Sequence, residues 1–244
     1  WMNNANGTGS MQLMYSNDGL NGWAPEIPLA NLTAPEFPPL IFADATGGLS
    51  AVFSSSGGIH CIHSSDSGNS WGMPVMATPD GHSPAAAQGS LGKIGIAWVS
   101  QESIRFAELA GCEPSGAKSF SAGGSAATPR IAPSPKGGYG IAWLDNTSKE
   151  IMFAYTEGTE SHVVSNTVGN SGDPRIAYDS AGTAHIAWRD SGDTGGAGAG
   201  EWDIWHAKYA HGGERIGAPK PIARTGGFPS EEPVIAISPQ DIPP

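Results

Sequence analysis

The sequence has few charged residues, and acidic residues outnumber basic ones. Of 244 residues, 14% are charged, against about 25% in an average soluble domain. Twelve Lys and Arg residues stand against 23 Asp and Glu residues, which gives a formal charge of −11. A surface that binds nucleic acid needs clustered positive charge to meet the phosphates. The composition therefore argues against nucleic acid as a partner.

The chain also lacks a long apolar run and has only two cysteines. No stretch approaches the roughly 18 apolar residues of a membrane-spanning helix, so we expect no membrane insertion. Cys61 and Cys112 lack the short spacing of a metal site, and they form either one disulfide or two buried thiols. The first residue is Trp1 rather than Met, so we expect a processed or incomplete product and an extracellular or periplasmic location.

Glycine and proline are abundant, with 35 and 20 residues respectively. Both residue types favour turns, because glycine adopts positive φ and proline fixes φ. The composition therefore predicts many short strands joined by tight turns, with few helices.

The sequence repeats with a period of 45 residues. Four segments align without gaps, and their first residues are Pro39, Pro84, Pro129 and Pro174. In each segment an apolar run, a glycine and a second apolar run follow the proline, which predicts a β-hairpin. The second run ends in an aromatic residue fourteen positions after the proline, namely Phe53, Trp98, Trp143 and Trp188.

Two weaker apolar runs follow each predicted hairpin, so one period supplies four antiparallel strands, which is typical of a propeller blade. A fifth copy begins at Pro233, after an insertion at roughly 191–202, and Trp1 fits its missing aromatic residue. We therefore expect an all-β chain that forms a single domain over 1–244. We expect this domain to be a five-bladed β-propeller of four-stranded antiparallel blades, closed by strands from both termini. The alternative is an open solenoid or part of a larger propeller. The predicted blades are 233–244 with 1–33, 39–78, 84–122, 129–168 and 174–223.

Two short segments share an acidic turn pattern. The segment 64–71 reads S-x-D-x-G-x-x-W, and the segment 16–23 is a near copy. Together with the repeated hairpins they resemble the Asp boxes of the sialidase-like, or BNR-repeat, β-propeller superfamily. An Asp in such a turn accepts backbone hydrogen bonds and the glycine permits positive φ, so we expect a structural role without calcium. The residues concerned are Ser16, Asp18, Gly19, Trp23, Ser64, Asp66, Gly68 and Trp71.

The starts of the first strands and the ends of the second strands should gather around one mouth of the central channel. The P-R-I-A runs at Pro129 and Pro174 resemble the first-strand arginine motif of sialidases, which implies a site for a substrate carboxylate. The insertion adds a loop to the same face, and loops on rigid scaffolds commonly bind ligands. We expect ligand-binding roles for Arg130, Arg175, Arg189, Asp145, His82 and Trp202.

Three carboxylates at this mouth are candidates for catalysis. They are Asp173, Asp190 and Glu232. If their pKa values differed, two of them could act as the general acid and as the base or nucleophile of a glycoside hydrolase. The alternative, which we favour, is a ring of salt bridges between these carboxylates and the arginines. We likewise favour packing between blades over sugar stacking for the repeated aromatic residues.

The sequence therefore predicts a recognition module that binds a glycan or a protein surface at the channel mouth. It predicts no metal and no cofactor, and it leans against an enzyme because no complete catalytic set is present. The alternatives are a glycoside hydrolase, either sialidase-like or of another five-bladed type, and a subunit of a larger assembly.

Overall fold

The computed structural model describes part of the chain, and the named elements of that part are all β-strands. The described residues are 2–5, 8–13, 27–33, 39–43, 47–55, 58–89, 92–121, 123–191, 202–223 and 232–237, with backbone alone for the first three ranges. Within these ranges no helix has the length and apolar character needed to cross a bilayer.

The strands form five antiparallel sheets in which each strand pairs with the next one along the chain. The first sheet has three strands, β1 (Met2–Ala5), β2 (Thr8–Leu13) and β3 (Ile27–Thr33). The second sheet contains β4 (Leu40–Ala43), β5 (Leu49–Ser55), β6 (Gly58–Ser64) and β7 (Val75–Thr78). The third contains β8 (His82–Gln88), β9 (Ile94–Ser100), β10 (Ser103–Ala110) and β11 (Glu113–Phe120).

The last two sheets repeat the same four-stranded pattern. The fourth sheet contains β12 (Ala126–Pro133), β13 (Tyr139–Asp145), β14 (Glu150–Tyr155) and β15 (Ser161–Val163). The fifth contains β16 (Ser171–Tyr178), β17 (Ala184–Asp190), β18 (Asp203–Tyr209) and β19 (Lys220–Ala223). The prediction of an all-β chain built from four-stranded antiparallel sheets is confirmed.

The predicted closure of the ring lies mostly outside the described residues. Residues 232–237 form no strand, while Trp1 and residues 238–244 are not among the described ones. The first sheet has three strands rather than four. Five blades and a closing strand from Pro233 onward therefore stay predictions.

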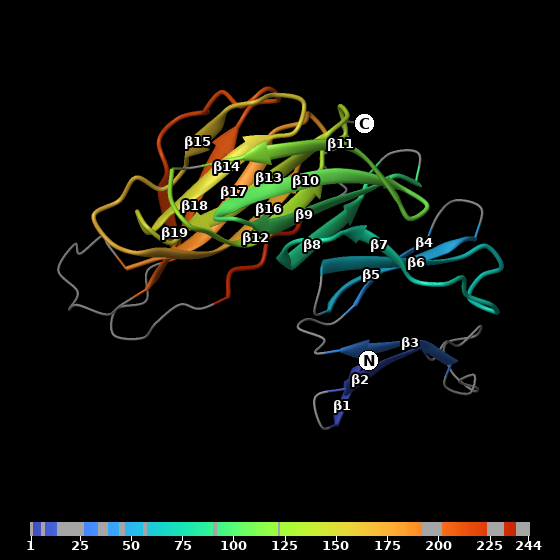
Figure 1. The fold of residues 1–244 in the computed structure, drawn as a ribbon. Coiled ribbons are helices and arrows are strands. Elements are labelled where there is room, and N and C mark those ends of the chain that lie inside the picture. The colour runs from blue at the N-terminus through green and yellow to red at the C-terminus, as the bar shows by residue number, and fades with distance from the viewer. Residues whose placement is uncertain are drawn as a thin grey trace.

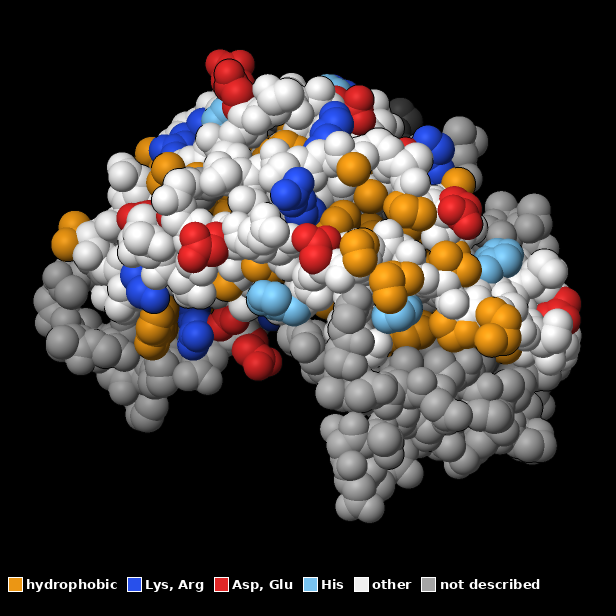
Figure 2. Space-filling model, viewed as in Figure 1, with side chains coloured by type: hydrophobic (Ala, Val, Ile, Leu, Met, Phe, Trp, Pro, Cys, Tyr) orange, Lys and Arg blue, Asp and Glu red, His pale blue; other side chains and the backbone are white. Residues whose placement is uncertain are grey.

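The five sheets follow one another in chain order, from the first sheet at the bottom of Figure 1 to the fifth at the left. The first strands β4, β8, β12 and β16 are neighbours in that order, so they form the inner edges of consecutive sheets. Charged side chains are scattered singly over the face seen in Figure 2, and hydrophobic ones gather over the second and third sheets.

The hydrophobic core lies between successive sheets rather than at one centre. One cluster joins the second and third sheets, another the third and fourth, and a further one the fourth and fifth. The middle strand β9 is buried at every position, and β13 at all but one. A strand that is buried on both faces explains why the sequence shows continuous apolar runs rather than alternation.

The repeated aromatic residues supply the largest side chains of these interfaces. Trp98, Trp143 and Trp188 each belong to the cluster that joins their own sheet to the preceding one. Trp143 and Trp188 are fully buried, and Phe53 is 1% exposed. The predicted packing role is confirmed, because a buried ring offers no face to a sugar.

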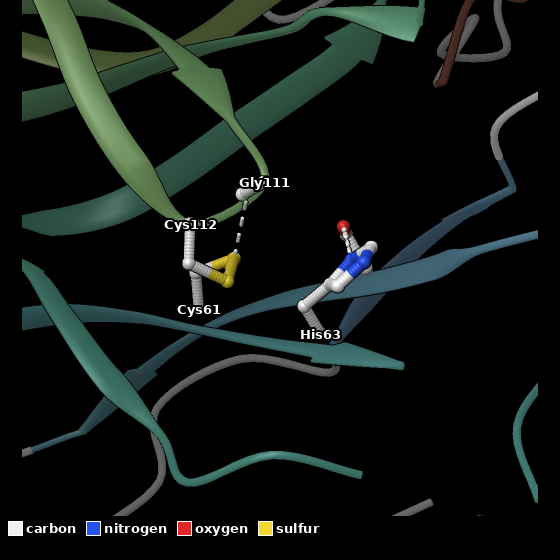
Figure 3. The surroundings of a disulfide bond; sticks show 5 residues. Cys61, His63, Gly111 and Cys112 are labelled. Carbon is white, nitrogen blue, oxygen red and sulfur yellow. Dashed lines mark hydrogen bonds between the residues drawn. A yellow bond between two sulfur atoms is a disulfide. The ribbon is translucent and has the colours of Figure 1, made fainter. Parts of the chain in front are cut away.

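A disulfide joins the second and third sheets (Figure 3). Cys61 lies on β6 and Cys112 lies in the β10–β11 turn, and the two Cα atoms are 5.3 Å apart. The Sγ atom of Cys61 lies 3.7 Å from the carbonyl oxygen of Gly111. On the neighbouring part of β6, His63 Nδ1 lies 3.0 Å from Ser50 Oγ. Of the two alternatives for the cysteines, the structure has the disulfide.

Removal of this disulfide should destabilise the fold. The bond closes a segment with a sequence separation of 51 residues, and the loss of chain entropy in the unfolded state corresponds to about 4 kcal/mol for a loop of this size. We expect the double variant Cys61→Ala/Cys112→Ala to lose about this much free energy of unfolding in urea denaturation. Reducing agent should lower the stability of the wild type and leave the double variant unchanged; equal stability of the two proteins without reductant would contradict the prediction.

Tyr139 links the third and fourth sheets and should make the fold sensitive to alkaline pH. Its hydroxyl donates a hydrogen bond to the carbonyl oxygen of Lys93, 3.1 Å away, and a Cβ added to Gly95 would lie 2.7 Å from its ring. Burial raises the pKa of Tyr139 to about 12 from its ordinary value of 10.0, and nearby Glu108 adds to the effect.

The unfolded chain therefore loses the Tyr139 proton first as pH rises. The stability contributed by the raised pKa is fully present below pH 10 and is lost as pH rises through about 12. Relative to Tyr139→Phe, the wild type should lose up to about 2.7 kcal/mol across this interval. Urea denaturation of both proteins at several pH values measures the difference, and parallel curves would refute the assignment.

Candidate functional site

Each first strand of the last three sheets starts with a β-bulge that contains a proline. In β8, β12 and β16 two consecutive residues stand opposite one residue of the next strand. The second of the two is Pro84, Pro129 or Pro174. Proline has no N–H to donate to the ladder, and the extra residue of a bulge removes it from regular pairing. The residue before each proline has positive φ: Ser83 (53°), Thr128 (46°), Asp173 (48°) and, at the same place in the fifth copy, Glu232 (53°).

These bulges lie at the edge of the sheets where the mouth is predicted. Ala126 at the start of β12 pairs with Asp145 at the end of β13, and Ser171 pairs with Asp190 in the same way. The starts of first strands and the ends of second strands thus lie at one edge of each sheet. Thr128 is exposed at this edge. Bulges commonly redirect side chains beside binding sites.

Two arginines follow the prolines on neighbouring inner strands. The Nη1 atom of Arg130 donates to the carbonyl oxygen of Pro129 at 2.9 Å, and that of Arg175 donates to Pro174 at 3.0 Å. The pKa of Arg130 is lowered, mainly by burial and further by the positive charge of Arg175, while Asp173 acts in the opposite direction. Arg130 and Arg175 lie on the neighbouring strands β12 and β16, and their positive charges disfavour each other.

A third arginine is held beside the same bulge. The Nε atom of Arg189 on β17 lies 2.6 Å from Asp173 Oδ2, and its guanidinium carbon lies 4.5 Å from the centre of the Trp202 ring. Gly172 permits the approach, since a Cβ there would lie 3.2 Å from Arg189 Nε. Arg130, Arg175, Arg189, Asp173 and Trp202 are called the mouth cluster below. Its three arginines and one carboxylate leave a formal charge excess of two positive charges.

The other predicted carboxylates have different surroundings. Asp190 is 1% exposed, and its Oδ2 accepts hydrogen bonds from Ser171 Oγ at 2.6 Å, Thr167 Oγ1 at 2.7 Å and Trp188 Nε1 at 3.2 Å. It thus ties the start of β16 to the end of β17. Glu232 is exposed, and its predicted catalytic role stays a prediction.

Asp145 holds the position in the fourth sheet that Asp190 holds in the fifth. It is 4% exposed, and it accepts hydrogen bonds from the N–H of Thr147 at 2.9 Å and from Ser148 Oγ at 2.8 Å. Its bonds hold the β13–β14 turn. His82 is exposed, and its Nδ1 lies 3.0 Å from Ser83 Oγ. Ligand binding by either residue stays a prediction.

The turn 64–71 has the geometry that its pattern predicts. Asp66 Oδ1 accepts hydrogen bonds from the N–H of Ser70 and from Ser64 Oγ, both at 2.8 Å, and Gly68 has a φ of 88°. Hydrogen bonds from Ser70, and a further one from Ser64, lower the pKa of Asp66. These contacts build the β6–β7 turn. The second predicted Asp box, at 16–23, and residues 192–201 of the insertion lie outside the described residues.

Sequence reasoning missed a polar pocket on the opposite face. Its volume is about 400 Å³ and its lining includes Tyr139, Tyr155 and His211. Tyr155 at the end of β14 and His211 in the turn after β18 are 56 residues apart and lie outside the repeated hairpin, so no local pattern brings them together. Among the described residues no group of three or more His, Cys, Asp or Glu side chains is placed to hold a metal ion.

Comparison with known proteins finds shared fold without shared sequence. No known family and no curated protein matches the chain. An ulvan lyase of polysaccharide lyase family PL25, bound to -[GlcA(1-4)Rha3S]-, is 12% identical with a TM-score of 0.55, over 89% of this chain and 69% of that one. A protein of unknown function from Dyadobacter fermentans is 12% identical with a TM-score of 0.52, over 87% and 83% of the two chains.

A protein from Lactobacillus plantarum is 11% identical with a TM-score of 0.52, over 88% of this chain and 65% of that one. At these identities the likeness concerns the fold alone. It supports a propeller-type arrangement of the sheets.

The backbone at Thr128 predicts a stabilising substitution. A β-branched residue at a φ of 46° is strained, whereas Asn adopts this region readily. We expect Thr128→Asn to raise the free energy of unfolding by about 0.5–1 kcal/mol, measured by urea denaturation. Thr128→Val keeps the β-branch and serves as the control, so the idea fails if the Asn variant is no more stable than the Val variant.

Proposed function

We propose that this protein is a glycan-recognition module that binds an acidic sugar at the mouth cluster. The observation that carries the proposal is the pair of arginines on the neighbouring strands β12 and β16, Arg130 and Arg175, with Asp173 as the one carboxylate of the cluster. The charge of this cluster is opposite to the formal charge of −11 of the whole chain. Such a local excess favours an anion over a neutral or basic ligand.

Arg130 and Arg175 keep donors for a ligand. Each uses an Nη1 hydrogen bond to its own strand, and a guanidinium has five N–H donors. Among the described residues, the ion pairs involve Lys93, His185 and Arg189 but neither of these two arginines. A carboxylate or sulfate group could accept paired hydrogen bonds from each guanidinium and relieve the repulsion between them.

Trp202 gives the cluster an aromatic surface. Its ring is partly exposed and its position is fixed by Arg189, which pairs in turn with Asp173. An aromatic face beside charged donors suits a sugar ring that carries an acidic substituent. The fold shared with an ulvan lyase bound to -[GlcA(1-4)Rha3S]- supports a glycan ligand.

The proposal favours binding over hydrolysis because Asp173 and Asp190 are already engaged by protein partners. A glycoside hydrolase needs a pair of carboxyl groups free to act as acid and as base or nucleophile. Asp173 is paired with Arg189, and Asp190 is engaged by three donors.

The proposal extends to the whole molecule and its location. We place the chain among sialidase-like, Asp-box propellers with five blades, the fifth completed by the segment from Pro233 beside the first sheet. The disulfide between Cys61 and Cys112 favours an oxidising compartment, in agreement with an extracellular or periplasmic protein.

Calorimetry with an oligosaccharide that contains glucuronic acid tests the function, and the carboxyl-reduced form of the same oligosaccharide is the matched control. We expect the acidic form to bind and the reduced form to bind at least about ten-fold more weakly. Arg130→Ala and Arg175→Ala should each weaken binding by a similar factor, and higher salt should weaken binding by the wild type.

Lys220→Ala removes an exposed positive charge of β19 and should bind like the wild type. Arg130→Lys keeps the charge but loses the planar fork, so it should bind with intermediate affinity. Circular dichroism checks that each variant is folded. Equal binding of the acidic and reduced oligosaccharides, binding by neither, or a protein partner that does not need the arginines would overturn the proposal.

A further inference from the structure

The polar pocket described above opens on the face opposite the mouth, which we call the turn face. The turn face is formed by the β8–β9, β12–β13 and β14–β15 turns, because Pro133 at the end of β12 pairs with Tyr139 at the start of β13. The pocket of about 400 Å³ lies here, and a second hollow of about 340 Å³ shares Gly89 with it. Volumes of roughly 300–1,000 Å³ are usual for small-molecule sites.

Three consecutive sheets contribute to this turn-face pocket. Lys93 and Glu108 come from the third sheet, Tyr139 and Tyr155 from the fourth, and His211 from the turn after β18 in the fifth. Sites at interfaces between structural units are common because such interfaces form concave surfaces. The packing of the sheets therefore sets the positions of these side chains.

A chain of hydrogen bonds fixes the aromatic wall of the pocket. The Tyr155 hydroxyl donates to the carbonyl oxygen of Gly137 at 2.6 Å, so its contact with His211 Nε2 at 3.3 Å requires that nitrogen to carry the proton. In neutral His211 the Nδ1 atom then accepts from Ser134 Oγ, 3.4 Å away. Burial raises the pKa of Tyr155, which keeps the phenol protonated. The rings of Tyr155 and His211 meet edge to face at 4.7 Å.

The charges around the pocket balance. Lys93 Nζ lies 2.9 Å from Glu108 Oε2, and the pocket lining adds one further residue of each sign, Lys136 and Glu157. A Cβ at Gly138, which has a φ of 64°, would lie 2.9 Å from Glu157 Cγ. The glycine therefore lets Glu157 lie close over the turn. A lining of this kind offers donors and acceptors without a net preference for an anion or a cation.

We propose that the turn-face pocket binds a neutral sugar residue. Hydroxyl groups both donate and accept, so they match ammonium donors, carboxylate acceptors and the imidazole of His211 at one site. The exposed ring of His211, which the buried Tyr155 ring supports from behind, supplies an aromatic surface for the apolar face of a pyranose. The site is separate from the mouth cluster and does not depend on the function proposed for it.

Saturation-transfer NMR and calorimetry with methyl glycosides of glucose, galactose, mannose, rhamnose and xylose test this site. We expect at least one of these neutral glycosides to bind with a Kd below about 10 mM. His211→Ala removes an exposed ring and should weaken binding at least about ten-fold. Glu157→Gln keeps the shape of the side chain and should weaken it by a factor of about three or more.

Lys220→Ala lies outside the pocket and should bind the glycoside like the wild type. An acidic oligosaccharide should not compete with the neutral glycoside, which distinguishes this site from the mouth cluster. Circular dichroism establishes that His211→Ala is folded, and Glu157→Gln tests the site independently. Binding of no glycoside, or binding that both pocket variants leave unchanged, would overturn the proposal.

Discussion

Burial of the middle strands between successive sheets is the interaction on which the rest of the structure depends. A strand such as β9 or β13 is covered on both faces, so each sheet needs a neighbour on either side to remove its apolar surface from water. The large aromatic residue of each repeat fills the space toward the preceding sheet. This packing brings β8, β12 and β16 side by side, and their neighbourhood places Arg130 near Arg175.

Backbone strain recurs beside the prolines of the repeats. Pro84, Pro129 and Pro174 lie in bulges, and the residue before each of them and before Pro233 has positive φ, a conformation that is unfavourable by about 1–2 kcal/mol for an L-residue. Because the strain recurs with Ser83, Thr128, Asp173 and Glu232, it belongs to the scaffold and not to one reaction. Contacts with charged groups depend instead on which residue occupies the strained position. Among these four, only Asp173 has an ion pair in the described part of the chain.

The period of 45 residues predicted the four-stranded sheets well, because strand length, turn glycines and buried aromatics all follow from one packing rule. It also placed Arg130, Arg175 and Arg189 at one edge. It did not predict the engagement of Asp190, since Thr167 and Ser171 lie outside the aligned hairpin. It left the cysteines open, since a pairing across 51 residues depends on how the sheets pack. The turn-face pocket was missed for the same reason.

The two faces of the molecule show how a repetitive scaffold acquires distinct sites. At the mouth, the repeat places equivalent backbone positions together. The mouth cluster there has three arginines and one carboxylate, while Asp145 and Asp190 at the same edge are buried and hydrogen-bonded. On the turn face the side chains come from strands and turns of three sheets, and the charges of Lys93, Lys136, Glu108 and Glu157 cancel. Charge selection at one face and shape with mixed hydrogen bonding at the other follow from these differences. On the two proposals made above, acidic and neutral sugar units are recognised by different faces, through side chains that the shared backbone does not determine.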